Sequence, residues 1–145
     1  MPLFPTAFWK RVSGGGGSTP SDNTLAPTRT DDPKSKVINV YTINYGPVVY
    51  FPFKNPNSNA MTLTRGVLTP GLPAPGLIYL GPNPYDIGSG VLHAISIVIP
   101  GNSIGNFMGW GYLDLHFPGP YTCDFTWSIS GGSSGTLGTF TVNLL

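Results

Sequence analysis

Glutamate and glutamine are absent from this chain of 145 residues, and alanine occurs only five times. All three are strong helix formers, so their scarcity disfavours a helical fold. Glycine occurs 20 times and proline 16 times, and both residues favour turns between strands. Because 40% of the residues are nevertheless hydrophobic, the chain can build a packed core and need not be disordered. The composition therefore predicts one all-β domain.

Charged residues are also scarce, at 9% of the chain against about 25% in an average soluble domain. All seven basic residues lie at or before Arg65, where three aspartates leave a net charge of +4, and the remainder carries three aspartates and no basic residue. So few charges leave little repulsion between copies. Attraction between opposite ends of neighbouring copies and chance placement explain the asymmetry about equally well.

Cysteine occurs once, at Cys123, so an intrachain disulfide is excluded and we expect this side chain to fill core space. Lys10 and Arg11 follow the first apolar stretch, which reverses the order found in a secretory signal. No segment approaches the roughly 18 apolar residues of a membrane span. We therefore expect a chain that is made in the cytoplasm, has no membrane partner, and stays soluble or joins a particle.

Residues 1–35 lack a strand or helix pattern and are expected to form an extended N-terminal arm, with residues 36–145 as the β-sandwich domain. The arm begins with a proline-spaced apolar tip, which we expect to anchor in a groove of a neighbouring subunit, because its large side chains would otherwise lie in water. The run of glycines that follows is expected to act as a hinge. The tip residues are Leu3, Phe4, Phe8 and Trp9, and the hinge residues are Gly14, Gly15, Gly16 and Gly17.

Strand-like runs separated by turn signals recur along the rest of the chain. There are eight: 36–43, 47–53, 61–68, 76–80, 90–99, 106–117, 121–130 and 136–144. This number fits an antiparallel β-sandwich or jelly roll. The clearest run is 121–130, in which Phe125, Trp127 and Ile129 alternate with polar residues, as expected for a sheet with one buried face. We expect these three side chains in the core.

Two of the runs leave alternatives open. In 90–99 both faces are largely apolar, which suits either a central strand or a strand covered by another subunit. In 106–117, Gly109 and Gly111 alternate with larger residues, so a bulge or another backbone could approach the face that lacks side chains. Trp110 and Tyr112, on the opposite face, are expected to be core or contact residues.

Residues that could carry catalysis or hold a metal are few. His116 lies two residues after Asp114 on one strand face, a pairing that can orient an imidazole or ligate a metal. No nucleophile motif and no further ligand at metal spacing accompany it, so we interpret it as a hydrogen-bonded surface pair, and His93 as a core or interface residue. The basic residues are too dispersed for specific nucleic-acid binding and are interpreted as solvated surface. We therefore expect no enzymatic activity, cofactor or metal.

Aromatic residues in the proline-rich loops support an alternative function. Tyr79, and Tyr85 beside Asp86, could stack on sugar rings in a carbohydrate- or receptor-binding module.

The segment PLFPTAFWKR, the glycine run, the scarcity of charge and the strands rich in Ser, Thr and Gly give the chain a resemblance to small virion proteins of tailed bacteriophages, particularly head decoration (auxiliary or cement) proteins. The resemblance implies a homo-oligomer, such as a trimer, in the virion. It would lie on a shell of major capsid protein and stabilise it, with arms crossing between subunits. The carbohydrate- or receptor-binding alternative would place the same domain in a phage tail or fibre. The resemblance transfers no functional residue to this chain.

Overall fold

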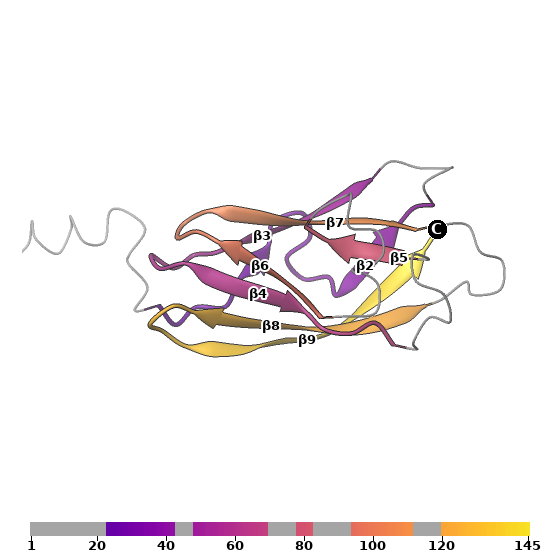
Figure 1. The fold of residues 1–145 in the computed structure, drawn as a ribbon. Helices are drawn as coiled ribbons and strands as arrows, with labels where there is room; N and C mark the ends of the chain where they lie inside the picture. The colour runs from indigo at the N-terminus through magenta and orange to yellow at the C-terminus, as the bar shows by residue number, and fades with distance from the viewer. Residues whose placement is uncertain (1–22, 43–47, 70–77, 83–93, 112–119) are drawn as a thin grey trace, which may run out of the picture.

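The expected all-β fold is confirmed. A computed structural model describes residues 23–42, 48–69, 78–82, 94–111 and 120–145, and these residues form nine strands and no helix (Figure 1). The strands are β1 (Thr28–Arg29), β2 (Val37–Val40), β3 (Val49–Lys54), β4 (Met61–Arg65), β5 (Ile78–Gly81), β6 (Ile95–Ile99), β7 (Ile104–Gly111), β8 (Tyr121–Ile129) and β9 (Ser134–Leu144).

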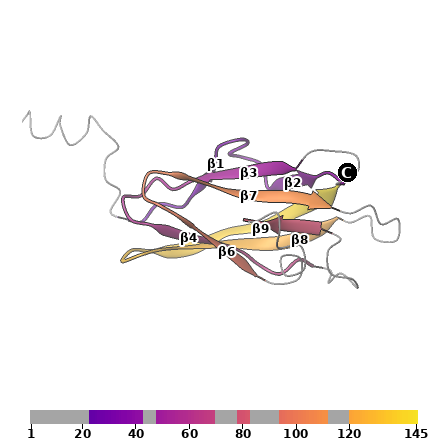
Figure 2. The ribbon, with the colours of Figure 1, turned by 45° about the horizontal axis from the view of Figure 1, so that its top comes forward.

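The strands form two sheets that pack face to face. Sheet A has the order β1-β3-β7-β5, and sheet B has the order β2-β9-β8-β4-β6. Figure 2 shows β3 and β7 in one layer and β4, β8 and β9 in the other. All eight expected runs contain a strand, although residues 43, 47, 76–77, 90–93 and 112–117 of those runs lie outside the described part of the chain.

Strand order also relates this sandwich to a known architecture. Strands β1, β3, β7 and β5 face β9, β8 and β4 in the same chain order in which strands A, B, E and D face G, F and C in immunoglobulin-type sandwiches. Strands β2 and β6 extend the two edges of sheet B. The described strands pair antiparallel as expected, except that β2 pairs parallel with β9. This pairing is possible because the chain crosses from sheet A to sheet B between β1 and β2.

Strand β8 confirms the predicted core face. Phe125, Trp127 and Ile129 are 0%, 8% and 5% exposed, and Cys123 is buried beside them. The Phe125 ring centroid lies 4.8 to 5.5 Å from three other phenyl rings, which belong to Phe53, Phe107 and Phe140. Both sheets contribute to this aromatic cluster, so it holds the two layers together.

The glycines of β7 allow another part of the chain to come close, as their spacing predicts. A Cβ atom on Gly109 would lie 2.6 Å from Cγ1 of Val40. At Gly111 the backbone N–H donates to the Tyr41 carbonyl at 2.8 Å, and Thr42 forms a parallel bridge with this glycine. The chain just after β2 therefore joins the edge of sheet B to sheet A. Trp110 is buried, and Tyr112 lies outside the described residues.

Strand β6 is not central. It forms one edge of sheet B, pairs only with β4 among the described strands, and leaves Val98 67% exposed. A central position in the sheet therefore does not explain the apolar residues on both faces of the run 90–99.

The boundary predicted between arm and domain at residue 35 lies too late in the sequence. Residues 28 and 29 form a strand that pairs with β3, and Arg29 is only 7% exposed. The prediction failed because two residues flanked by prolines give no recognisable strand pattern. Among the described residues, the sandwich therefore includes the stretch from Asn23 onward.

Candidate functional site

Four asparagines bind the first described residues of the chain to the sandwich. We call this set the junction (Asn23, Asn55, Asn57 and Asn59). The side-chain amide of Asn57 makes two hydrogen bonds with the backbone of Leu25: Oδ1 accepts from the Leu25 N–H at 3.0 Å and Nδ2 donates to the Leu25 carbonyl at 2.8 Å. The Asn57 amide thus makes the same two hydrogen bonds with the Leu25 backbone that a paired strand would make. It fixes Leu25 across 32 residues of sequence.

A second amide supports the first. Asn55 and Asn57 are both 0% exposed, and Oδ1 of Asn55 accepts from the Asn57 side chain at 2.9 Å. Nδ2 of Asn55 donates to the carbonyls of Asn59, Ile99 and Pro100 at 2.9 to 3.2 Å. Buried amides are costly unless their hydrogen bonds are made, so this network holds Asn57 in one orientation.

Asn23 completes the junction at the end of the sandwich opposite Leu145 (Figure 1). Its φ of 56° lies in the left-handed region, which asparagine tolerates better than most residues. Its side-chain Oδ1 accepts from the Asn59 N–H at 2.9 Å, and its carbonyl accepts from the Ser133 N–H at 3.0 Å. A Cβ atom on Gly132 would lie 2.3 Å from that carbonyl oxygen, so this approach requires glycine. The point at which residues 1–22 join the sandwich is therefore fixed.

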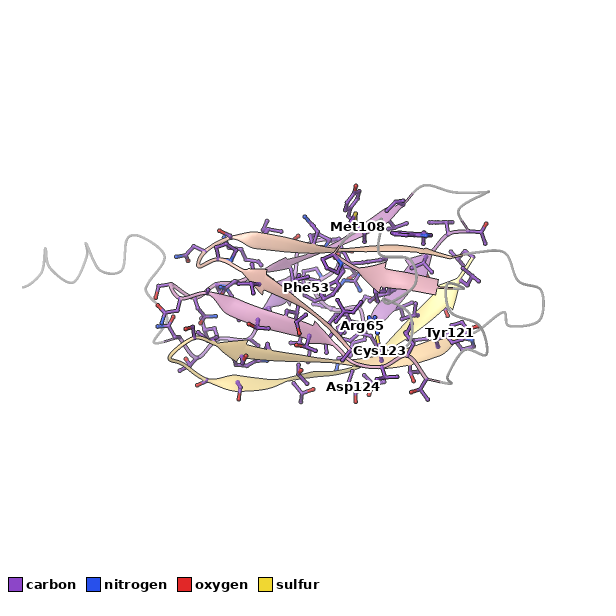
Figure 3. All side chains as sticks on the ribbon, viewed as in Figure 1. Phe53, Arg65, Met108, Tyr121, Cys123 and Asp124 are labelled. Atoms are coloured by element: carbon purple, nitrogen blue, oxygen red, sulfur yellow. The ribbon has the colours of Figure 1, made fainter. Side chains whose placement is uncertain are left out.

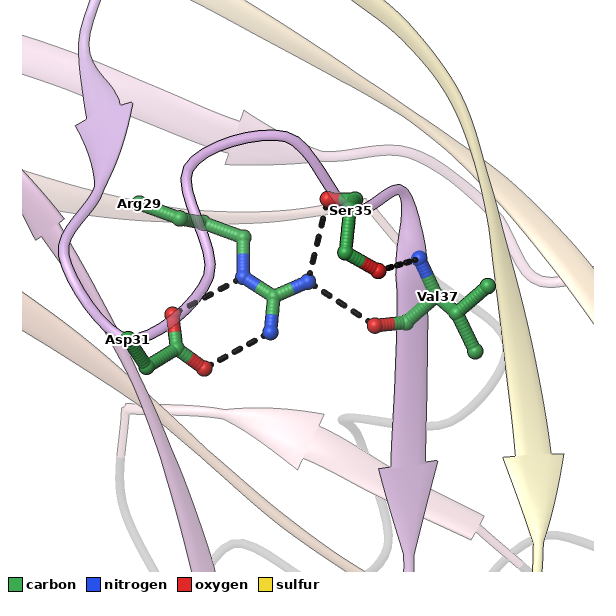
Figure 4. Close-up of polar contacts among 4 residues, drawn as sticks. All are labelled: Arg29, Asp31, Ser35 and Val37. Carbon is green, nitrogen blue, oxygen red and sulfur yellow. Dashed lines mark hydrogen bonds and ion pairs between the residues drawn. The ribbon is translucent and has the colours of Figure 1, made fainter.

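Arg29 organises the next part of the chain (Figure 4). Its guanidinium forms a two-point ion pair with Asp31, with Nε to Oδ1 at 3.0 Å and Nη2 to Oδ2 at 2.7 Å. Nη1 donates to the carbonyls of Ser35 and Val37 at 3.2 and 2.8 Å. The Arg29 hydrogen bond lowers the pKa of Asp31. We call this arrangement the Arg29 clip, because it binds the loop between β1 and β2 to the edge of sheet A.

A cavity of about 110 Å³ lies beside the Arg29 clip. Its lining includes the apolar residues Phe53, Leu137 and Phe140 and the basic residues Lys34 and Lys36.

Arg65 lies in the core and not in solvent, which corrects the interpretation of the basic residues as solvated surface. It is 0% exposed, and it links the two sheets because its Nε donates to the Leu80 carbonyl of β5 at 2.9 Å. Nη1 donates to the Gly66 carbonyl at 2.6 Å. Figure 3 shows Arg65 near Cys123 in the middle of the molecule. Burial raises the pKa of the Cys123 thiol to about 11, against the opposing effect of the Arg65 charge, so the thiol is protonated at neutral pH.

The sequence could have indicated Arg65. It follows Met61 and Leu63 at the inward-facing period of β4, so its position predicts burial although its charge does not. The junction gave no comparable signal. Its asparagines look like ordinary turn residues, and only the folded chain brings Asn57 to Leu25.

Most of the residues that the sequence singled out lie outside the described part of the chain. This holds for the tip and hinge of the arm, for the Asp114/His116 pair and His93, and for Tyr85 and Asp86. Among the described residues, no group of three or more His, Cys, Asp or Glu side chains could hold a metal ion. The same residues include no helix long and apolar enough to cross a membrane.

Comparison with known proteins gave no match: no protein family, no curated protein and no solved structure is significantly similar to this chain.

Proposed function

We propose that this protein is a structural component of a larger assembly, which it joins through its N-terminal segment (residues 1–22). The tip of that segment, Leu3, Phe4, Phe8 and Trp9, binds a neighbouring subunit, and Gly14 to Gly17 act as the hinge. The observation that carries the proposal is the junction. Two fully buried asparagines and a glycine required by close contact fix the chain where an apolar, glycine-linked segment is attached.

A fixed attachment point allows such a segment to bind a neighbouring subunit more effectively. When one end of a tether is held, its other end samples a limited volume, which raises its effective concentration at a neighbour's surface. Burying four large apolar side chains contributes about 1.5–3 kcal/mol each. Ordering a flexible chain costs about 1–2 kcal/mol per residue, so contacts along much of the segment must add to those of the tip.

The kind of assembly that we propose is a virion shell. The chain would act as a head decoration protein, with other copies of itself and a major capsid protein as partners. The resemblance in the N-terminal segment and the scarcity of charge support this proposal, because a surface with 9% charged residues offers little repulsion to contact between copies.

Deleting residues 1–20 tests the role of the segment. We expect the truncated chain to keep its melting temperature, since the junction and the sandwich remain, and to lose self-association in sedimentation velocity. Unchanged self-association of the truncated chain would refute the proposed function.

The substitution Asn57→Ala tests the junction itself while leaving the tip intact. It removes both hydrogen bonds that hold the Leu25 backbone to the sandwich. We expect weaker self-association. The control is Val142→Ala, which opens a cavity in the core and lowers stability without touching the junction. If the control weakens association as much, lost stability and not the junction explains the effect.

A further inference from the structure

The outer face of sheet A carries large apolar side chains that face solvent. Alternation along β3 and β7 directs Phe51, Phe53 and Phe107 inward, so their neighbours in sequence point outward. Tyr50 and Met108 lie opposite each other in the β3–β7 register, and Tyr50 is 58% exposed. On the same face Ile104 is 52% exposed. Figure 3 shows Met108 at the margin of the molecule, away from sheet B.

Polar groups are few on this face. Asn106 lies between Ile104 and Met108, and Lys54 lies opposite Ile104 at one end. The Lys54 ammonium donates to the Asn102 carbonyl, which holds it over that end of the sheet. We call the area of Tyr50, Pro52, Ile104 and Met108 the sheet A patch.

We propose that the sheet A patch binds the tip of the N-terminal segment of a second copy of this chain. The inference rests on the proposed function and names the receiving surface for it. The tip supplies three aromatic rings and a leucine, and the patch offers a tyrosine ring and a methionine thioether, which packs well against aromatic rings. The same chain thus carries both halves of an apolar contact.

The length of the segment is sufficient. From Trp9 to Asn23 the chain has 14 steps, which span up to about 45 Å when extended. The longest strand, β9, has 11 residues and is roughly 36 Å long. A tip attached at the junction of one copy can therefore reach anywhere along the sheet A patch of an adjacent copy.

The chemistry of the tip favours a sheet face over a sheet edge. Pro2 and Pro5 have no N–H group, so the tip cannot pair fully as an added strand. Charge also sets a direction, because Lys10 and Arg11 follow the tip and are repelled by Lys54. The tip therefore binds with its first residues toward Lys54 and its basic pair toward the other end of β7.

Crosslinking between two distinguishable copies tests the inference. One copy carries Thr6→Cys within the tip, and a second copy with a mass tag carries Asn106→Cys in the middle of the outer face of sheet A. The native Cys123 is buried and does not compete. A short bismaleimide should join the two copies. The control partner carries Ser128→Cys on the outer face of sheet B and should remain unjoined.

Substitution of the patch supplies the second readout. Tyr50→Ser combined with Met108→Ser should weaken self-association at least about tenfold in sedimentation velocity, which corresponds to about 1.4 kcal/mol. Val98→Ser is the control, since Val98 is 67% exposed on sheet B. The denaturation midpoint of each variant shows whether folding is intact.

The outcomes separate this inference from the proposed function. Loss of association on deleting residues 1–20, together with normal association of the patch variant and no selective crosslink, overturns the sheet A patch alone. A crosslink that forms only within a chain carrying both cysteines overturns binding to a second copy. Association that survives the deletion refutes both proposals.

Discussion

The two sheets share one core but present different surfaces. Outward positions of sheet B are mostly small hydroxyl side chains: Thr62, Thr64, Thr122, Thr126, Ser128, Thr136, Thr139 and Thr141. Several of them bond to a neighbour on the same face, as Thr64 does with Ser96 and Thr139 with Asp124, both at 2.6 Å. Outward positions of β3 and β7 in sheet A include Tyr50, Ile104 and Met108 instead.

This difference shows that strands with the same inward and outward alternation can present either a polar or an apolar outer face. Threonine is β-branched and favours strands, and its hydroxyl group remains hydrated. The threonines of sheet B therefore support strand formation without creating an apolar surface that favours association. The large apolar residues of sheet A also favour strands but leave a surface that gains free energy when covered. The interior should thus determine stability, and the outer faces should determine association.

The largest effect expected is that of Phe125→Ala on β8. Phe125 is 0% exposed and its ring contacts the rings of Phe53, Phe107 and Phe140, so truncation should cost about 3–5 kcal/mol. Thr126→Ala, on the outer face of the same strand, should cost no more than about 1 kcal/mol. Urea denaturation measures both. Similar midpoints for the two variants would show that stability is not concentrated inside the sandwich.

Arg65→Met should have the next largest effect, because it tests whether a buried charge ties sheet B to sheet A. Methionine keeps much of the apolar stem but leaves the Leu80 and Gly66 carbonyls without this donor. Each unpaired buried group costs about 1–3 kcal/mol, and we expect a loss of about 2–4 kcal/mol. Apolar residues sometimes replace buried charged groups at no cost. A variant as stable as the parent chain would therefore mean that the guanidinium does not hold the sheets together.

Parts of sheet B could be predicted from the sequence, where a strand alternates strictly and its inward residues are apolar. The run 121–130 is the best example, with every inward residue of β8 buried as expected. Prediction fails where a residue's partner is distant in sequence. Asn57 binds Leu25 across 32 positions, and the two-residue strand β1 exists only because β3 is there to pair with it. Local propensity contains no information on such contacts.

The order and direction of the strands could not be predicted from the sequence for a related reason. The predicted runs have the right positions, but nothing in the run 90–99 distinguishes an edge strand from a central one, since both faces are apolar. The parallel pairing of β2 with β9 likewise depends on the chain crossing between sheets after β1. The residues proposed for association, in the tip, could be chosen from the sequence because large apolar groups next to a glycine run need cover. The sheet A patch needed the register of β3 and β7.

The smallest effect on stability is expected at the edge of sheet A, where the Arg29 clip holds the loop before β2. This effect depends on pH. The side chain of Arg29 is 6% exposed and that of Asp31 is 34% exposed, so water screens their ion pair in part. The hydrogen bond from Arg29 lowers the pKa of Asp31 in the folded chain below its ordinary value.

A lowered carboxyl pKa adds stability above the ordinary pKa, and that stability is lost as pH falls through the lowered value. Asp31→Asn should therefore melt slightly below the parent chain at pH 7, and the difference should shrink as pH falls below the ordinary aspartate pKa of about 3.9. Ser35→Ala is the control, since it removes the hydrogen bond to the Val37 N–H in the same loop without removing an ionisable group, so its difference from the parent should not change with pH. A difference for Asp31→Asn that does not shrink in acid would show that the ion pair contributes nothing to holding this edge.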